Sequence, residues 1–239
     1  MACGLPPRFG WNAFPDVLIH APEPLVKAHQ AYAAAKSGDD QAAIELLNDT
    51  INPSQIEALA HLLAGRVPTL VSAHAFESSG VNAIPQALAD ELGERLGYPV
   101  DAAIVQSNIV GHTGADGFTR LARQAQFDGP VQPGTDYVLV DDFVGMGGTL
   151  ANLRGYLLSQ GGKVLAATVL TGKPHSARLA LSPERLDELR HTHGEELEQW
   201  WQNRFAHAFD TLTESEARYL ARSPDADTIR NRIAAAEQA

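Results

Sequence analysis

Cysteine is almost absent from this chain of 239 residues, because Cys3 is its only thiol. A single thiol cannot form a disulfide within the chain, which is typical of a protein in a reducing compartment. Long apolar runs are also absent, and the first residues lack the apolar segment of a secretory signal. We therefore expect a cytoplasmic protein with no membrane partner.

Basic residues are scarce relative to acidic ones. Lysine and arginine number 18 against 29 aspartates and glutamates, so the formal net charge is -11. Broad nucleic-acid binding needs a positive surface, so we expect no nucleic-acid partner. A small anionic ligand remains compatible with this charge, because a local group of backbone N–H donors can bind it.

Apolar and helical patterns alternate through the middle of the chain. Residues 69–72 and 102–106 have the pattern of short buried strands, and residues 82–97 between them have that of a helix. A strand, a helix and a second strand in this order indicate a parallel sheet. Further strands are predicted at 137–140 and 164–170, with a helix at 150–159 between them.

These elements predict an α/β fold with a doubly wound parallel sheet and helical extensions at both ends. We assign residues 1–65 to an N-terminal arm and helical lobe, 66–174 to the core, and 175–239 to a helical C-terminal extension. Aromatic residues gather in the last part of the chain. They predict a small aromatic core there, although one of them facing a site and stacking on a base is the alternative. The aromatic residues in question are Trp200, Trp201, Phe205, Phe209 and Tyr219.

The most informative stretch is 137–152. Asp141 and Asp142 follow directly after apolar residues, and a loop with three glycines leads to Thr149, where a helical pattern begins. Adjacent carboxylates at the end of a buried strand repel each other and favour a ligand, such as sugar hydroxyls or a ligand-borne Mg²⁺. The glycines and the helix N-terminus suit an anion. Together they predict a ligand with a phosphate beside a diol.

Other nucleotide sites fit this stretch poorly. A dinucleotide-binding turn needs a third glycine where Leu150 stands, and an acid after the next strand, 164–170, where none occurs. A phosphate-binding loop of the Walker type needs a lysine before Thr149, and Gly148 stands there. Both classes are therefore disfavoured.

Residues 138–150, V-L-V-D-D-F-V-G-M-G-G-T-L, resemble the phosphoribosyl pyrophosphate (PRPP) motif of type I phosphoribosyltransferases. The resemblance implies that Asp141 and Asp142 bind the ribose hydroxyls, directly or through Mg²⁺. It also implies a clamp for the 5′-phosphate, made by Gly145, Met146, Gly147, Gly148 and Thr149. Met146 stands where the family often has threonine, and Gly145 where its 6-oxopurine members have a catalytic aspartate.

The resemblance places a pyrophosphate loop at Ser72, Ala73 and His74, where no lysine or arginine is present. It places a flexible loop at 107–129, in which Arg120 and Arg123 would bind phosphate or pyrophosphate. Gly111, Gly114 and Gly117 would be its hinges, and a surface β-hairpin is an equally good interpretation of this region. The terminal extensions would form the hood that recognises the second substrate.

The implied function is transfer of ribose 5-phosphate from PRPP to a nitrogen nucleophile, with Mg²⁺ as cofactor and a homodimer as the assembly. Two alternatives remain open at this stage. One is a regulator that binds PRPP or a nucleotide without catalysis, which the missing basic residues of the pyrophosphate loop favour. The other is a hydrolase that releases the base from a nucleotide. The nature of the nucleophile stays undetermined by the sequence.

Overall fold

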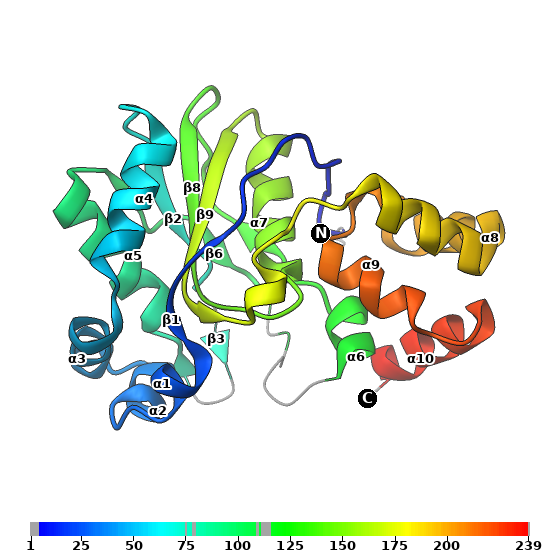
Figure 1. Cartoon of the computed structure of the whole chain (residues 1–239), viewed down its shortest axis with the longest axis horizontal. Helices are drawn as coiled ribbons and strands as arrows, with labels where there is room; N and C mark the ends of the chain where they lie inside the picture. The colour runs from blue at the N-terminus through cyan, green and yellow to red at the C-terminus, as the bar shows by residue number, and fades with distance from the viewer. Residues whose placement is uncertain (1–4, 75, 78–79, 109, 111–115, 239) are drawn as a thin grey trace.

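Five parallel strands form the central sheet of the computed structural model, which describes residues 5–74, 76–77, 80–108, 110 and 116–238 (Figure 1). Their order across the sheet is β1, β9, β8, β2 and β5. In that order the strands span Leu18–Pro22, Lys163–Gly172, Asp136–Val144, Thr69–Ser72 and Val100–Asp101. The predicted α/β class with a parallel sheet is confirmed.

One face of the sheet is covered by helices from the first hundred residues. These helices are α1 (Glu23–Lys27), α2 (Tyr32–Lys36), α3 (Asp40–Thr50), α4 (Pro53–Leu63) and α5 (Ile84–Leu96). Leu88 and Leu92 of α5 lie in one apolar cluster with Val138 and Val140 of β8. The helix ends at Gly97, whose φ of 69° is left-handed, as the sequence predicts.

Helix α7 (Gly148–Ser159) covers the opposite face. Side chains alternate along a strand, so Tyr137 and Leu139 point away from α5. They join Leu153 and Leu157 of α7 in a second apolar cluster. Helices therefore lie on both faces, and the sheet is doubly wound as predicted.

The first 65 residues share the core of the sheet. Strand β1 pairs in parallel with β9, and Leu18 lies opposite Thr168. Ala35 and Leu46, from α2 and α3, are buried in the same cluster as the sheet residue Leu70. The boundary at 65–66 therefore does not separate two cores.

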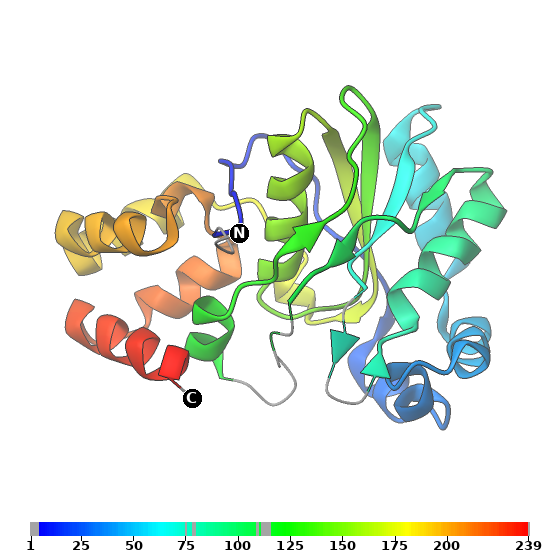
Figure 2. The same ribbon diagram turned by 180° about the vertical axis from the view of Figure 1, so that it is seen from behind.

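The C-terminal residues form a helical lobe at one end of the molecule, beside α7 (Figure 2). Its elements are η1 (Pro174–Ser176), α8 (Pro183–Phe205), η2 (Phe209–Thr211), α9 (Glu214–Ala221) and α10 (Ala226–Gln238). Trp201, Phe205 and Phe209 are buried in its centre, so the structure contains the small aromatic core that the sequence favours. Helix α8 kinks at Gly194 (φ 73°).

Several boundaries differ from the sequence predictions. Strand β8 continues to Val144, so the two acids lie within the strand rather than after it. The strand predicted at 102–106 is wrong: β5 ends at Asp101, and β6 (Val105–Gln106) leaves the sheet to pair with β7 (Phe127–Asp128) in antiparallel. The antiparallel pairing is that of a hairpin, but it is not the surface hairpin of the alternative interpretation, because Gln106 and Phe127 are buried and a helix lies between the two strands.

Two short segments complete the fold. α6 (Gly117–Ala122) lies between β6 and β7 and packs against α10, while β3 (Phe76–Glu77) pairs with β4 (Gly80–Val81). Gly111 and Gly114, two of the predicted hinges, lie outside the described residues. In the described ranges, no helix combines the length and apolar character that a membrane span requires.

Candidate functional site

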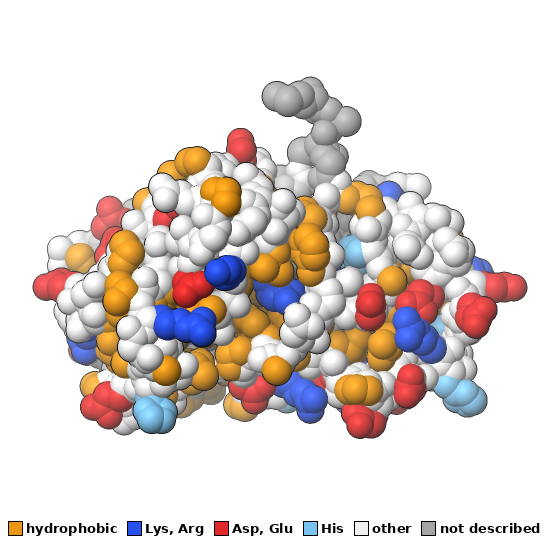
Figure 3. All heavy atoms as spheres, turned by 90° about the horizontal axis from the view of Figure 1, so that it is seen from above, with side chains coloured by type: hydrophobic (Ala, Val, Ile, Leu, Met, Phe, Trp, Pro, Cys, Tyr) orange, Lys and Arg blue, Asp and Glu red, His pale blue; other side chains and the backbone are white. Residues whose placement is uncertain are grey.

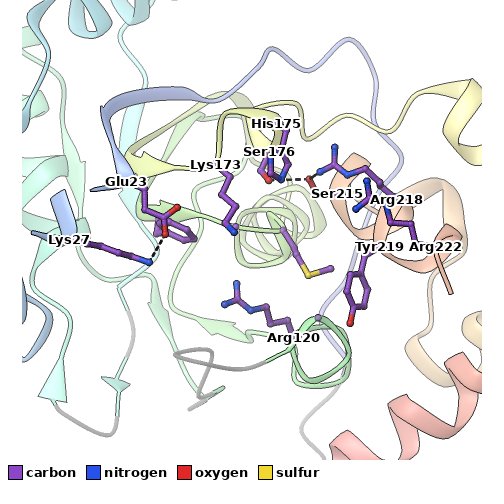
Figure 4. A pocket seen from close by; sticks show the side chains of 14 residues that line it. Glu23, Lys27, Arg120, Lys173, His175, Ser176, Ser215, Arg218, Tyr219 and Arg222 are labelled. Atoms are coloured by element: carbon purple, nitrogen blue, oxygen red, sulfur yellow. Dashed lines mark hydrogen bonds and ion pairs between the residues drawn. The ribbon is translucent and has the colours of Figure 1, made fainter. Parts of the chain in front are cut away.

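The carboxyl edge of the sheet holds a cavity of about 360 Å³ (Figure 4). Strands β1, β9 and β8 are parallel neighbours, so the segments that follow them meet at one edge. Phe143, Gly145 and Met146 of the predicted motif line the cavity, together with Lys173 directly after β9. Ligands of open parallel sheets bind at this edge, so the motif lies where a ligand site is expected.

Basic side chains dominate the described lining of the cavity. They come from α1, α6, the segment after β9, and α9 with its C-cap, and they are Lys27, Arg120, Lys173, Arg218 and Arg222. Glu23 is the one acid among the described lining residues, and its carboxylate accepts a 2.5 Å bond from Lys27. By contrast, the face of the molecule seen in Figure 3 carries acidic and basic side chains close together. In a chain of net charge -11, this concentration of positive charge indicates an anionic ligand.

Asp141 and Asp142 differ in their surroundings. Asp141 is 6% exposed, and its Oδ1 accepts a 2.8 Å hydrogen bond from the backbone N–H of Asp142. Burial raises the pKa of Asp141 well above its ordinary value, and the neighbouring charge of Asp142 raises it further. Asp142 points to the other face and forms a 3.0 Å ion pair with Lys36 of α2. Only Asp142 thus has a cation at hydrogen-bond distance.

The glycine loop divides between the cavity and the C-terminal lobe. Gly145 lies against Arg120, because a Cβ at this glycine would be 2.8 Å from the guanidinium Nη1. The carbonyl of Met146 accepts a 2.6 Å bond from the Thr213 hydroxyl. Gly147, the N-cap of α7 with φ 82°, is buried beneath Leu179. Gly145 and Met146 therefore line the cavity, whereas Gly147 is covered.

A buried ion pair lies beside the start of α7. Arg8 of the N-terminal arm donates to both carboxylate oxygens of Glu216, at 2.6 and 3.0 Å, and to Asn152 of α7 at 2.7 Å. A Cβ on Gly148 would come within 2.7 Å of Oε1 of Glu216. A carboxylate of the chain itself thus occupies space beside the helix start that the sequence assigned to a ligand phosphate. Thr149 is partly exposed at this helix start.

The predicted pyrophosphate loop lies next to the motif but does not line the cavity. Ser72 pairs in register with Val140, one residue before Asp141. The Ser72 hydroxyl contacts Nδ1 of His74 at 2.7 Å and Gln86 at 2.8 Å. Ser72 and Ala73 are buried, and burial lowers the pKa of His74. Arg123 is also outside the cavity lining, and its Nε donates to the carbonyl of Ala236 at 3.3 Å.

Sequence reasoning found Arg120 but missed the other cations of the cavity. Lys173 had a signal, since it directly follows β9 and so lies at the same sheet edge as the motif. Arg218 and Arg222 are four residues apart, the spacing that puts side chains on one side of a helix. Nothing in the sequence places that helix beside β8, so its role could not be inferred.

Metal ligands are few at this edge. Among the described residues, no three His, Cys, Asp or Glu side chains are grouped to hold a metal ion. Mg²⁺ is often bound through one or two carboxylates together with substrate phosphates. Asp142, the partly exposed acid of the motif, fits such a ligand-borne ion, whereas the buried Asp141 fits it poorly.

Comparison with known proteins gives sequence relatives and weak structural neighbours. No family model matches the chain. It is 39% identical over 229 residues to protein TraN of Escherichia coli, covering 96% of this chain and 51% of TraN. It is 36% identical over 154 residues to an uncharacterized protein of Haemophilus influenzae, covering 64% of this chain and 34% of that protein. The chain thus spans about half or less of the curated relatives it matches.

The structural neighbours include phosphoribosyltransferases. An adenine phosphoribosyltransferase from Thermoanaerobacter pseudethanolicus is 19% identical with a TM-score of 0.34, covering 55% of this chain and 73% of the enzyme. The UMP synthase of Leishmania donovani is 16% identical with a TM-score of 0.31, covering 73% of this chain and 36% of that chain. TM-scores this low say nothing about activity. The fold is therefore described from the strand order of its own sheet.

Proposed function

We propose that this chain binds PRPP at the carboxyl edge of the sheet and transfers its ribose 5-phosphate to a nitrogen nucleophile. The observation that carries the proposal is the cationic cavity beside the motif, where Arg120 lies against Gly145 and Lys173 follows the neighbouring strand. PRPP carries phosphate groups at two ends and a diol between them. The cations of the cavity suit the phosphates. Asp141 and Asp142 are absent from the described lining, but they directly precede Phe143, which does line the cavity, and their carboxyl groups suit the diol.

The transfer exchanges one bond at C1 of the ribose. The acceptor nitrogen forms a bond to C1 while the bond from C1 to the pyrophosphate oxygen breaks, and pyrophosphate leaves with the electron pair. The nitrogen then gives its proton to solvent. C1 carries oxocarbenium-like charge in such a transition state. Bound Mg²⁺ would neutralise the leaving pyrophosphate.

The residues of the chain contribute position and charge. The Asp142 carboxylate accepts hydrogen bonds from ribose hydroxyls, or binds a ligand-borne Mg²⁺, and Lys36 holds it in place at 3.0 Å. Asp141 is more readily protonated because of its raised pKa, so it can donate a hydrogen bond as well as accept one. Arg120 and Lys173 bind phosphate oxygens and fix the orientation of C1.

A regulator that binds PRPP without catalysis is the second candidate. Two observations favour it. The Arg8–Glu216 ion pair lies beside Gly148 and fills space at the start of α7 where a phosphate would bind. Ser72 and Ala73 of the predicted pyrophosphate loop are buried. Such a site would bind the ligand but stabilise the leaving group poorly.

Pyrophosphate release separates the two candidates. Purified protein is incubated with PRPP, Mg²⁺ and a panel of nitrogen bases, and pyrophosphate is followed by a coupled assay. We expect release that depends on one base and is lost in Asp142→Asn. Asp136→Asn is the matched control, because Asp136 begins the same strand at the opposite edge. Binding of PRPP without release under any base would favour the regulator and contradict the transferase.

The family resemblance also supports a homodimer. Light scattering coupled to size-exclusion chromatography tests it: a mass of twice 25.6 kDa is expected, and a monomer at all concentrations would contradict it.

A further inference from the structure

Three cations line the side of the cavity formed by the C-terminal lobe. Lys173 follows β9, Arg218 lies on α9 and Arg222 is the C-cap of α9, while the motif lies on β8 and its loop. In Figure 4 the Lys173 side chain reaches into the cavity, with Arg218 and Arg222 on the side of α9. Glu23 belongs to α1, across the cavity from α9, where it is bonded to Lys27 and is also affected by the charge of Lys173. The described C-terminal side of the cavity is therefore uniformly basic.

These cations act on one another. Burial lowers the pKa of His175, which also lines the cavity, and the charges of Arg218, Lys173 and Arg222 lower it further. Desolvation is the main cause that lowers the pKa of Arg218, and the charge of Arg222 is the next largest. Within the described part of the chain, neither Lys173 nor Arg222 forms an ion pair. A bound anion would relieve this repulsion.

Hydroxyl groups orient the cluster without neutralising it. Arg218 donates a 2.8 Å hydrogen bond from Nη2 to the Ser215 hydroxyl, which lies 3.2 Å from the hydroxyl of Ser176. Both serines are buried and line the cavity. One guanidinium of the cluster is thus held in position before any ligand arrives, which lowers the entropy cost of binding.

An aromatic ring lies beside these cations. Tyr219 lines the cavity, and its ring lies directly against Gly117, where a Cβ would overlap it. Phe118 supports it edge-on, with ring centroids 5.1 Å apart. A partly exposed ring held in this way offers a flat surface for a planar ligand. Tyr219 is thus the candidate for the alternative in which one aromatic residue of the C-terminal extension faces the site.

We propose that the second ligand of this site, the phosphoribosyl acceptor, is a planar heterocycle that carries a carboxylate. Arg218 and Arg222 bind the carboxylate, and Tyr219 packs against the ring. Guanidinium groups match a carboxylate in shape and charge. A neutral base would leave Arg222 without an anionic partner in the described part of the chain, so the site also selects against it. The inference rests on the proposed transferase function and adds its acceptor class.

Matched pairs of bases test the acceptor class. Orotate is compared with uracil, and nicotinate with nicotinamide, because the members of each pair share a ring and differ in the carboxylate. Pyrophosphate release with PRPP and Mg²⁺ is the readout. We expect one carboxylated base to exceed its neutral partner in kcat/KM by roughly tenfold or more. Equal rates within a pair, or preference for the neutral base in both pairs, would overturn the inference while leaving the transferase intact.

Variants of α9 test which ligand the cations bind. Arg222→Gln should raise the KM of the carboxylated base roughly tenfold and change the Kd of PRPP less than about twofold. Arg178→Gln is the control, since Arg178 is exposed and is absent from the described lining. If Arg222→Gln weakened PRPP as much as the base, the cations would serve the phosphates of PRPP and the inference would be wrong. Failure of the unaltered protein to bind PRPP would remove the transferase proposal itself.

Discussion

At the scale of single residues, two buried histidines make the stability of the folded state sensitive to acid. Burial lowers the pKa of His20 to about 4, and burial together with the charge of Arg8 lowers that of His207 to about 4. Both start from 6.5, so their stabilising contribution is complete above pH 6.5 and is lost as the pH falls toward 4. Protonation of each histidine should lower the free energy of unfolding by about 2 kcal/mol at pH 5.

Urea unfolding at pH 7 and pH 5 measures this loss. His207→Asn should lose less stability between the two pH values than the unaltered protein. The exposed His61, replaced in the same way, should leave the difference unchanged. An equal pH dependence for all three proteins would show that the buried ring of His207 does not resist protonation.

Asp141 gives the opposite pH dependence. Its raised pKa means that the folded state prefers the protonated carboxyl, so stability is lost as the pH rises through the folded pKa. Asp141→Asn keeps the acceptor of the 2.8 Å bond from Asp142 and removes the ionisation. We expect the melting temperature at pH 8 to rise by about 2–4 °C, the shift that roughly 1 kcal/mol gives in a chain of this length. A variant that melts lower at pH 8 than the unaltered protein would contradict the buried-charge account.

At the scale of elements, the N-terminal arm is bound to α7 and α9 through one ion pair. Arg8 and Glu216 have side chains only 2% and 3% exposed. Removing one partner leaves the other charge buried, so Arg8→Ala and Glu216→Ala should each lower the unfolding free energy by about 3–5 kcal/mol. The double variant should cost less than the sum of the two, as measured by a chemical-denaturation cycle. Strict additivity would mean that the two side chains do not interact in solution.

The close contact between α7 and the arm depends on one glycine. A Cβ at Gly155 would overlap the carbonyl oxygen of Pro7, and backbone cannot move aside as easily as a side chain. Gly155→Ala should therefore destabilise the protein by about 1–3 kcal/mol and make the arm more accessible to protease. Gly10→Ala is the control, because Gly10 lies in the same arm and the new Cβ would have nothing within 4 Å. If Gly155→Ala and Gly10→Ala melted at the same temperature, the arm would not pack against α7 at Gly155.

The sequence predicts the layout of the whole molecule better than its site. Local patterns are strong for α5, which ends at a capping glycine, and for β8, which begins with an apolar run. The doubly wound sheet could therefore be inferred from the sequence. Strand β1 and helix α10 were missed because their pairing depends on distant partners, β9 and α6.

The candidate site shows the same limit. The acids of β8 and the glycine loop are contiguous and were recognised. The cations of the cavity come from positions as far apart as Lys27 and Arg222, and only packing brings them together. Glu216 beside Gly148 was equally invisible, because its capping box with Thr213 explains it locally without reference to α7.

At the scale of the whole molecule, we propose that PRPP binds where the carboxyl end of β8 meets the cationic cavity. Calorimetric titration of the protein with PRPP in the presence of Mg²⁺ tests it most directly. The account predicts one site per chain with a Kd between about 1 µM and 1 mM. It also predicts affinity at least roughly tenfold weaker in Asp142→Asn and unchanged in Asp136→Asn. Absence of binding heat, or equal affinity in both variants, would contradict the account.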